Sequence, residues 1–262
     1  MKYICLSFDD SRKDTYTQAL PIMEKYGLKG TVNVISQFVL KTEHQKNLEK
    51  LEFKSFDLAM SIKDLLDWER KGNEIACHGS THCNSVKDIL QNIEELKEMN
   101  ISVQNIGFAS PNSELTTKLL YETGIIELYK NRTLLYLRSG IQVCREGIIY
   151  SILSVLEKIT HSKFLFWLLQ KRNIMKYRKL PLLLKSVAVK NYTRIEQIKY
   201  VIEKMDKEDC LILMFHSILN KKDTDYEKDS WYWEDKYFEE LCEYLVRSEN
   251  ILVLTTKELV LK

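Results

Sequence analysis

Residues 3–35 read YICLSFDDSRKDTYTQALPIMEKYGLKGTVNVI, with an apolar run at each end and a helical pattern between them. The two runs, 3–8 and 31–35, predict buried strands. Between them, apolar residues recur at helical spacing and stop at Gly27, which suits the left-handed position after a helix. Strand, helix and strand in this order are typical of a unit built around a parallel sheet.

The same alternation continues along the chain. Ser61 and Asp64 form a capping-box-like start for a helix that ends near Gly72. Further elements are predicted as strand 74–77, helix 87–99, strand 105–109, helix 113–123, strand 125–129, helix 194–206, strand 210–215, helix 234–247 and strand 251–254. Residues 130–193 break the rhythm without a clear strand, so we expect an irregular insertion or irregular barrel elements there, within one α/β domain spanning residues 1–262.

Composition excludes some functions. Lys and Arg number 39 against 37 Asp and Glu, so no overall field favours a nucleic acid. The six cysteines include no CxxC pair and are expected to be free thiols, with Cys5, Cys77 and Cys210 in core strands and Cys83 also packed. The run 3–8 follows Met1 directly, which leaves no room for a signal peptide, and we expect a cytoplasmic protein.

Chemically active residues follow four of the predicted strands. They are Asp9 with Asp10, His78, Ser110 with Pro111, and His216. Because sites on parallel sheets and barrels form beyond the carboxyl ends of the strands, these residues are expected to converge.

Each of these motifs has a functional and a plain interpretation. Adjacent carboxylates at Asp9 and Asp10 repel each other and favour a nearby cation, but they also suit a solvated turn. The histidines of HGSTH, 78–82, can share one face of a helical turn and bind a divalent ion, or be one core and one surface residue. His216 ends the run LILMFH and is either a core histidine or a catalytic group over the sheet edge.

Taken together, the order FDD, HxxxH and LxLxxH resembles the polysaccharide deacetylase family, the carbohydrate esterases with a NodB homology domain. The segment LPIMEKYGLKGTVNV, residues 20–34, also looks like the segment after the family's first motif. The resemblance runs from about residue 3 to 256 and implies a distorted (β/α) barrel, although residues 130–193 match poorly.

The resemblance also implies a role for each motif residue. Asp9 would be the general base, Asp10, His78 and His82 the metal ligands, and His216 the general acid. The implied cofactor is a divalent ion, with Zn favoured over Co, Ni or Fe. The implied reaction removes an N-acetyl group from a sugar, giving acetate and a free amino sugar.

The chain departs from the family pattern at two places. Ser11 stands where glycine is common, which changes little if the backbone there does not need a positive φ. In GFASPN, residues 107–112, Ala109 stands where an arginine usually orients the catalytic aspartate. Arg138 is a possible substitute, or a plain surface arginine, and with Pro111 and Asn112 it is a candidate for substrate binding.

The substrate is expected to be an N-acetylated saccharide or a lipid-linked sugar. Trp231 and Trp233 could line a sugar site, although packing on the barrel is the favoured role for them. One alternative function is an amidohydrolase acting on a small cyclic amide, which a closed pocket would favour. The other is a degenerate domain that binds a glycan without turnover.

Residues 158–195 contain ten Lys or Arg and no Asp or Glu, and they include FLFWLL at 164–169. Clustered cations beside aromatic residues suit peripheral contact with an anionic membrane, here the inner face, where lipid-linked sugars would be within reach. The plain alternative is a buried amphipathic helix with a solvated basic rim.

Overall fold

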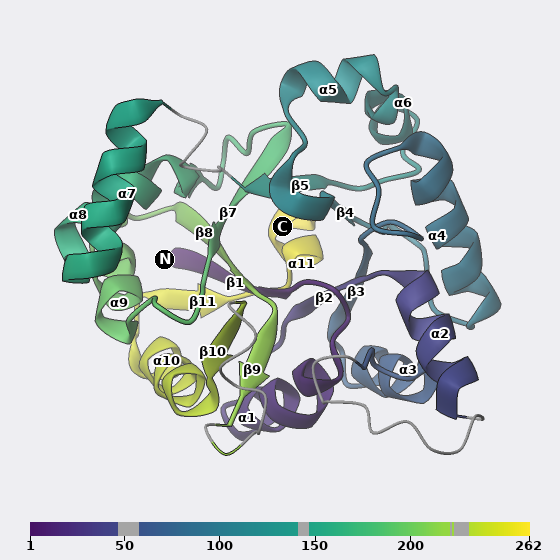
Figure 1. Ribbon diagram of the computed structural model, residues 1–262, viewed down its shortest axis with the longest axis horizontal. Helices are drawn as coiled ribbons and strands as arrows, with labels where there is room; N and C mark the ends of the chain where they lie inside the picture. The colour runs from purple at the N-terminus through teal and green to yellow at the C-terminus, as the bar shows by residue number, and fades with distance from the viewer. Residues whose placement is uncertain (47–57, 141–146, 221, 223–230) are drawn as a thin grey trace.

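The computed structural model describes residues 1–46, 58–140, 147–220, 222 and 231–262. Its centre is a ring of parallel strands (Figure 1). In hydrogen-bonded order these are β1 (Lys2–Phe8), β2 (Thr31–Val34), β3 (Glu74–Cys77), β4 (Phe108–Ala109), β5 (Leu137–Gly140), β7 (Leu183–Ala188) and β8 (Asp209–Phe215). The ring closes because β8 pairs with β1 from Tyr3 to Phe8.

The barrel is irregular beside β1. At the start of β1, residues Lys2 to Ile4 pair with β11 (Ile251–Val253), whereas β2 pairs only with Ser7 and Phe8. β11 therefore takes the place of β2 at the amino end of β1. This arrangement confirms the predicted α/β fold of the distorted barrel type.

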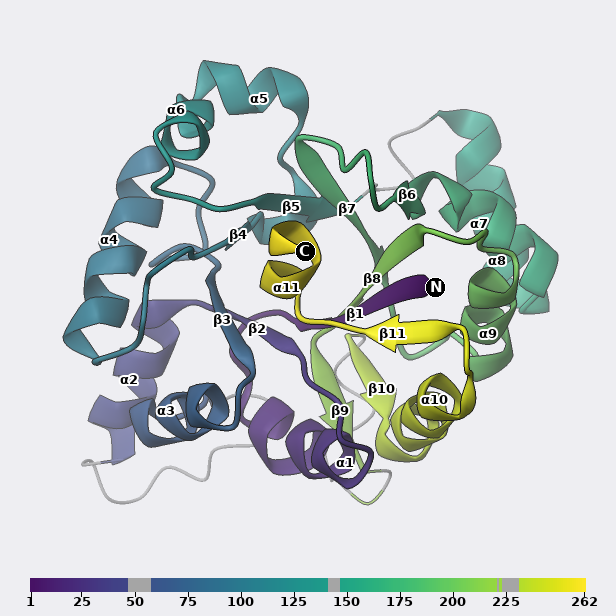
Figure 2. The same cartoon turned by 180° about the vertical axis from the view of Figure 1, so that it is seen from behind.

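Helices surround the ring, and three short strands lie beside it (Figures 1 and 2). They are the π-helical turn η1 (Thr15–Ala19), α1 (Leu20–Lys25), α2 (Ser36–Lys46), α3 (Ile62–Arg70), α4 (Val86–Glu98), the 3₁₀ turn η3 (Pro111–Ser113), α5 (Thr117–Glu122), α6 (Ile125–Lys130), α7 (Ile148–Thr160), α8 (Lys163–Gln170), the 3₁₀ turn η5 (Lys171–Asn173), β6 (Met175–Lys176), α9 (Ile195–Glu203), β9 (Ser217–Leu219), β10 (Tyr232–Glu234), α10 (Asp235–Arg247) and α11 (Thr256–Leu261). No helix among the described residues is long and apolar enough to cross a bilayer.

Helix α11 lies across the amino ends of the strands (Figure 2). The Thr256 N–H donates to Thr31 Oγ1 at 3.0 Å, and the Lys257 N–H donates to Glu74 Oε2 at 2.8 Å. Because Thr31 and Glu74 begin β2 and β3, α11 closes this end of the barrel. The carboxyl ends of the strands are therefore the end that remains for a site.

Several predicted elements are present with small shifts in their bounds. The capping box is confirmed: Ser61 Oγ accepts from the Asp64 N–H at 3.1 Å, and Asp64 Oδ2 accepts from the Ser61 N–H at 2.7 Å. Gly27 has φ +65°, as expected after a helix. The thiols of Cys5, Cys77 and Cys210 are buried and free, whereas Cys83 is exposed, so its predicted packing role is wrong. Cys144 lies outside the described residues.

The prediction of a strand over 125–129 is wrong, because these residues form α6. Its buried residues Ile125, Ile126 and Leu128 fit one helical face as well as a strand, so the short apolar run was ambiguous. The next barrel strand is β5, and both β5 and β7 lie within residues 130–193, so the interpretation as barrel elements is confirmed there over that of an insertion. Polar residues such as Arg138 and Ser186 interrupt the apolar pattern of these two strands, so the pattern did not predict them.

Candidate active site

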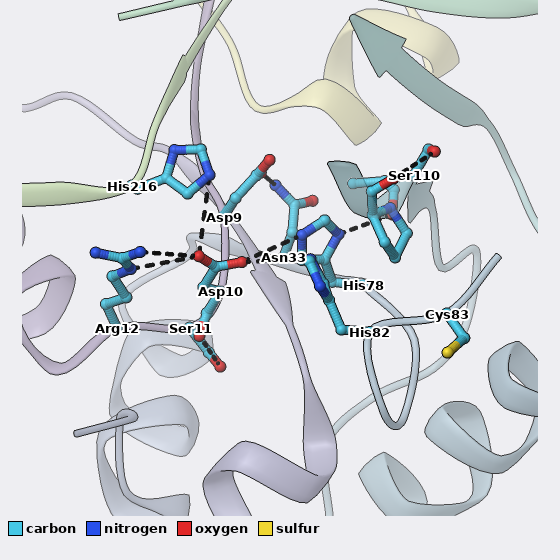
Figure 3. Close-up of polar contacts among 12 residues, drawn as sticks. Asp9, Asp10, Ser11, Arg12, Asn33, His78, His82, Cys83, Ser110 and His216 are labelled. Carbon is cyan, nitrogen blue, oxygen red and sulfur yellow. Dashed lines mark hydrogen bonds and ion pairs between the residues drawn. The ribbon is translucent and has the colours of Figure 1, made fainter. Parts of the chain in front are cut away.

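Asp10, His78 and His82 bring their side chains together at the carboxyl ends of β1 and β3 (Figure 3). Asp10 Oδ1 lies 3.4 Å from His78 Nε2 and 3.7 Å from His82 Nε2. One ligand atom from each residue lies within 4.8 Å of the other two. The two carboxylates after β1 diverge, so Asp9 points elsewhere (Figure 3).

The backbone after β1 is unusual, because Asp10 and Ser11 both have positive φ, +70° and +50°. Serine was expected to replace glycine at position 11 without effect only if the backbone there does not need a positive φ, and Ser11 does have one. A left-handed conformation costs an ordinary residue about 1–2 kcal/mol. The Ser11 N–H donates to the Asn33 carbonyl at 3.1 Å, and this contact with β2 holds the turn.

The histidines lie on a loop rather than on the helical turn that we predicted. Gly79 and His82 have φ of +82° and +65°, yet the rings of His78 and His82 face each other with centroids 4.8 Å apart. Glycine is required at position 79, because a Cβ there would lie 2.4 Å from Asp88 Oδ2.

Asp88, at the start of α4, holds this loop in place. Its carboxylate accepts from the Thr81 N–H and the Cys83 N–H, both at 3.0 Å. It also accepts from the Thr81 hydroxyl at 2.7 Å. Asp88 was not predicted as a functional residue, because an acid in the first turn of a helix is ordinary capping.

The donor set fits a divalent cation. His78 Nδ1 lies 2.8 Å from the Ala109 carbonyl oxygen and must donate to it, because a carbonyl only accepts. Nε2 of His78 then faces the Asp10 carboxylate, and two acceptors face each other unless a cation or a proton lies between them. Tetrahedral ligands at about 2.0–2.2 Å from a zinc ion are about 3.3–3.6 Å apart, which is close to the separations found here.

The charges of these groups reinforce one another. Burial would raise the pKa of Asp10, but His78, His216 and Arg12 hold it well below its usual range. Burial lowers the pKa of His78, yet Asp9 and Asp10 raise it more. Arg12, which the sequence analysis missed, donates to Asp10 Oδ2 from Nε at 3.3 Å and Nη2 at 3.2 Å. The other carboxylate oxygen, Asp10 Oδ1, faces His78 and His82.

Asp9 is buried and ion-paired with Arg138. Arg138 Nη2 lies 2.6 and 2.8 Å from the two Asp9 oxygens, and Asn33 Nδ2 donates to Oδ1 at 2.7 Å. Burial would raise the pKa of Asp9, but Arg138, His78 and His216 lower it, so the carboxyl group is held ionised. The sequence signal for Asn33 was a polar residue inside the apolar strand TVNV.

Arg138 reaches Asp9 from the strand beside Ala109. In the pairing of β4 with β5, Ala109 and Arg138 are partners, so the arginine stands directly next to the position where the family usually has one. Arg138 is only 1% exposed, which excludes the plain surface interpretation. Its Nη1 also donates to Ser186 Oγ on β7 at 3.2 Å.

His216 follows β8 and completes the cluster (Figure 3). Its Nε2 lies 3.9 Å from Asp10 Oδ2, and burial lowers its pKa to about 4. The Trp231 ring packs on the His216 ring with centroids 4.5 Å apart. Trp233 is buried instead and packs on Phe215, so only Trp231 borders the site.

A cavity of about 490 Å³ lies over these residues. Its near wall includes Asp9, Asp10 and the three histidines, and its far wall comes from α7 and α8, including Glu157 and Phe166. Asn112 lines this cavity, whereas Pro111 is buried and absent from its walls. Arg138 lies behind Asp9 and is also absent from the walls.

Similarity to known proteins agrees with this architecture. The polysaccharide deacetylase family model matches residues 1–124. No curated protein sequence matches the chain.

Three solved structures share the fold at low identity. The Xyl-CE4 domain of a multidomain xylanase from the hindgut metagenome of Trinervitermes trinervoides is 16% identical, with 98% of this chain and 89% of that one covered and a TM-score of 0.51. A family 4 acetyl xylan esterase from Clostridium thermocellum, in complex with a cobalt ion, is 14% identical, with the same coverage and TM-score. The peptidoglycan N-acetylglucosamine deacetylase Bc1960 is 9% identical, with 98% and 87% covered and a TM-score of 0.52. These findings confirm the resemblance to the polysaccharide deacetylase family, in sequence over residues 1–124 and in fold over nearly the whole chain.

Proposed function

We propose that this protein is a metal-dependent deacetylase that hydrolyses an N-acetyl group on a sugar. The observation that carries the proposal is the convergence of Asp10, His78 and His82 beside the ionised, arginine-paired Asp9 at the floor of a cavity. The family of the matching model and the fold of the acetyl xylan esterase and the peptidoglycan deacetylase support deacetylation as the reaction.

Asp10, His78 and His82 would hold the ion. A divalent ion in this site would lower the pKa of a water molecule and polarise the amide carbonyl of the substrate. Zinc is the favoured ion because two imidazoles and one carboxylate are a usual zinc set with an open position.

Two residues of the chain would move protons. Asp9 would accept a proton from the attacking water, and Arg138 and Asn33 fix its carboxylate for that task. His216 would donate a proton to the departing amine nitrogen. Because burial lowers its pKa to about 4, the imidazole is neutral at pH 7 and would have to gain this proton during turnover. The water oxygen forms the new C–O bond first, and the C–N bond then breaks as the nitrogen takes its proton, giving acetate and an amino sugar.

The substrate is proposed to be an N-acetylated saccharide. A cavity of about 490 Å³ suits roughly one or two sugar rings rather than a long polymer. Trp231 borders the cavity, where its ring packs on His216 and its ring centre lies 3.5 Å from Lys190 Nζ, so an aromatic group lies beside the proposed sugar site.

The test combines metal analysis with acetate release. The purified protein is assayed on a panel of N-acetylated monosaccharides, oligosaccharides and lipid-linked sugars, with Zn²⁺, Co²⁺, Ni²⁺ or Fe²⁺ added and after chelation. We expect acetate release that chelation abolishes and that the His78→Ala variant lacks, whereas Cys83→Ser, an exposed position on the same loop, retains it. Binding of an ion without turnover of any substrate would favour a degenerate binding domain, and turnover that survives chelation would reject the metal role.

A further inference from the structure

Helix α7 has its polarity reversed with respect to the usual surface helix. Its six exposed apolar side chains are between 45% and 78% exposed. They are Ile148, Ile149, Ile152, Val155, Leu156 and Ile159. At 100° per residue these positions fall on one face of the helix roughly 120° wide. The α7 apolar face, as we call these six residues, therefore points to solvent.

The polar side of α7 faces the protein. Glu157 is 3% exposed and accepts from Gln197 Nε2 of α9 at 2.6 Å. Ser154, Glu157 and Lys158 line the cavity above the candidate active site. An ordinary amphipathic helix would bury the isoleucines and expose the glutamate, so this helix is suited to contact an apolar medium on its outer side.

The helix that packs on α7 carries exposed cations and an exposed aromatic residue. In α8, which packs on α7, Phe164 is 54% exposed and its ring lies 5.8 Å from that of Trp167. Lys163 and Lys171 are exposed at the two ends of α8. Lys163 Nζ lies 5.9 Å from the centre of the Tyr200 ring, and Lys171 Nζ lies 5.4 Å from the centre of the Trp167 ring. Contacts with aromatic rings do not neutralise either charge, so both lysines can attract an anionic partner.

We propose that the α7 apolar face lies on an anionic lipid bilayer. An apolar helical stripe with aromatic and basic residues at its edge is the pattern of a helix that lies in the membrane interface. A second copy of the chain fits less well. In a two-fold contact of this face with itself, the α7 apolar face offers no carboxylate to pair with Lys163 and Lys171, whereas an anionic bilayer does offer negative charge.

The surface that we propose for membrane contact differs from the one that the sequence suggested. Phe166 is buried and Leu169 lines the cavity, so much of FLFWLL faces the protein. The exposed face instead begins at Ile148, before residues 158–195. Because opposite sides of α7 form this face and the cavity wall, docking would place the cavity about one helix diameter, roughly 10 Å, from the bilayer surface. If the proposed function holds, a sugar carried on a lipid would then be the substrate class.

Vesicle flotation tests the docking. The full chain is floated with phosphatidylcholine vesicles and with vesicles that also contain phosphatidylglycerol. We expect binding to the anionic vesicles that weakens as salt rises. The variant Ile152→Glu with Ile159→Glu should lower the partition coefficient at least about tenfold. The matched control Val246→Glu, 51% exposed on α10, should leave it unchanged.

A second pair of variants tests the charges. Lys163→Gln and Lys171→Gln should each lower binding to anionic vesicles about fivefold. Lys118→Gln is the control, since Lys118 is exposed on α5 at a site remote in sequence. Equal losses for all three would mean that only net charge matters and would overturn the assignment to this face.

Other outcomes reject the proposal directly. Absence of flotation at low salt would overturn it. Concentration-dependent dimers in sedimentation, removed by Ile152→Glu with Ile159→Glu, would assign the face to a second copy if vesicles do not bind. Acetate release from a water-soluble N-acetyl sugar keeps the two proposals separate: flotation without acetate release would reject the proposed function alone, and acetate release without flotation would reject the docking alone.

Discussion

Residues 1–124 and residues 125–262 contribute to the site in different ways. The first region supplies Asp9 and the three convergent ligand atoms from two short motifs. The second supplies Arg138 and His216, which come from separate strands and contact the groups of the first. The groups that would hold a cation are thus local in sequence. Arg138, which pairs with Asp9, and the α7 and α8 residues that form the far wall of the cavity are brought in only by the fold.

The largest effect is expected inside the first region. Asp9→Asn keeps the shape of the side chain but removes the proton acceptor, and kcat for acetate release should fall by about 10²–10⁴-fold. Metal content, measured by mass spectrometry, should stay near that of the parent protein, whereas Asp10→Asn should lower it. Unchanged turnover in Asp9→Asn would remove Asp9 as the base and weaken the division between the regions.

The next effect couples the two regions. Arg138→Met leaves the buried Asp9 carboxylate without its cation, and the free energy of unfolding in urea at pH 7 should fall by about 3–5 kcal/mol. The double variant with Asp9→Asn should recover most of this loss. Arg70→Met, whose side chain is 79% exposed in a surface ion pair, should cost less than about 1 kcal/mol. Additive effects of Asp9→Asn and Arg138→Met would contradict the pairing.

The smallest effect is expected for His216, which lies in the second region. His216→Ala should lower kcat about 10²-fold on an N-acetyl sugar without loss of metal, since it removes only the proton donor for the amine. On an activated acetyl ester, whose leaving group needs no proton, the loss should shrink. An equal loss on both substrates would indicate that His216 positions the site rather than protonates the leaving group.

The sequence predicted the first region better than the second for physical reasons. Apolar strands ending in Asp10 and His78 follow simple patterns, and the structure brings their side chains together. The conformation of the histidine loop could not be predicted, because it depends on Asp88 and on the positive φ of Gly79. β5 and β7 were not predicted, because polar residues of the candidate site, such as Arg138, interrupt their apolar runs.

The direction in which the α7 apolar face points could not be predicted from the sequence either. A helix pattern gives the width of an apolar face but not its direction, so the sequence allowed either a buried helix or a surface one. Only the contacts of Glu157 with Gln197 and with the cavity fix which side faces the protein.

The pairing of β1 with β8 also determines when the site can form during synthesis. β1 ends at Phe8 and β8 begins at Asp209, so a chain leaving the ribosome at about 5–20 residues per second waits roughly 10–40 s between the two. During that interval the β1 edge that β8 will cover has no partner from β8, and Asp10 has no His216 beside it. Pairing across such a separation is slow, and unpaired strand edges promote aggregation. The nascent chain therefore carries the ligand motifs well before it carries a closed barrel.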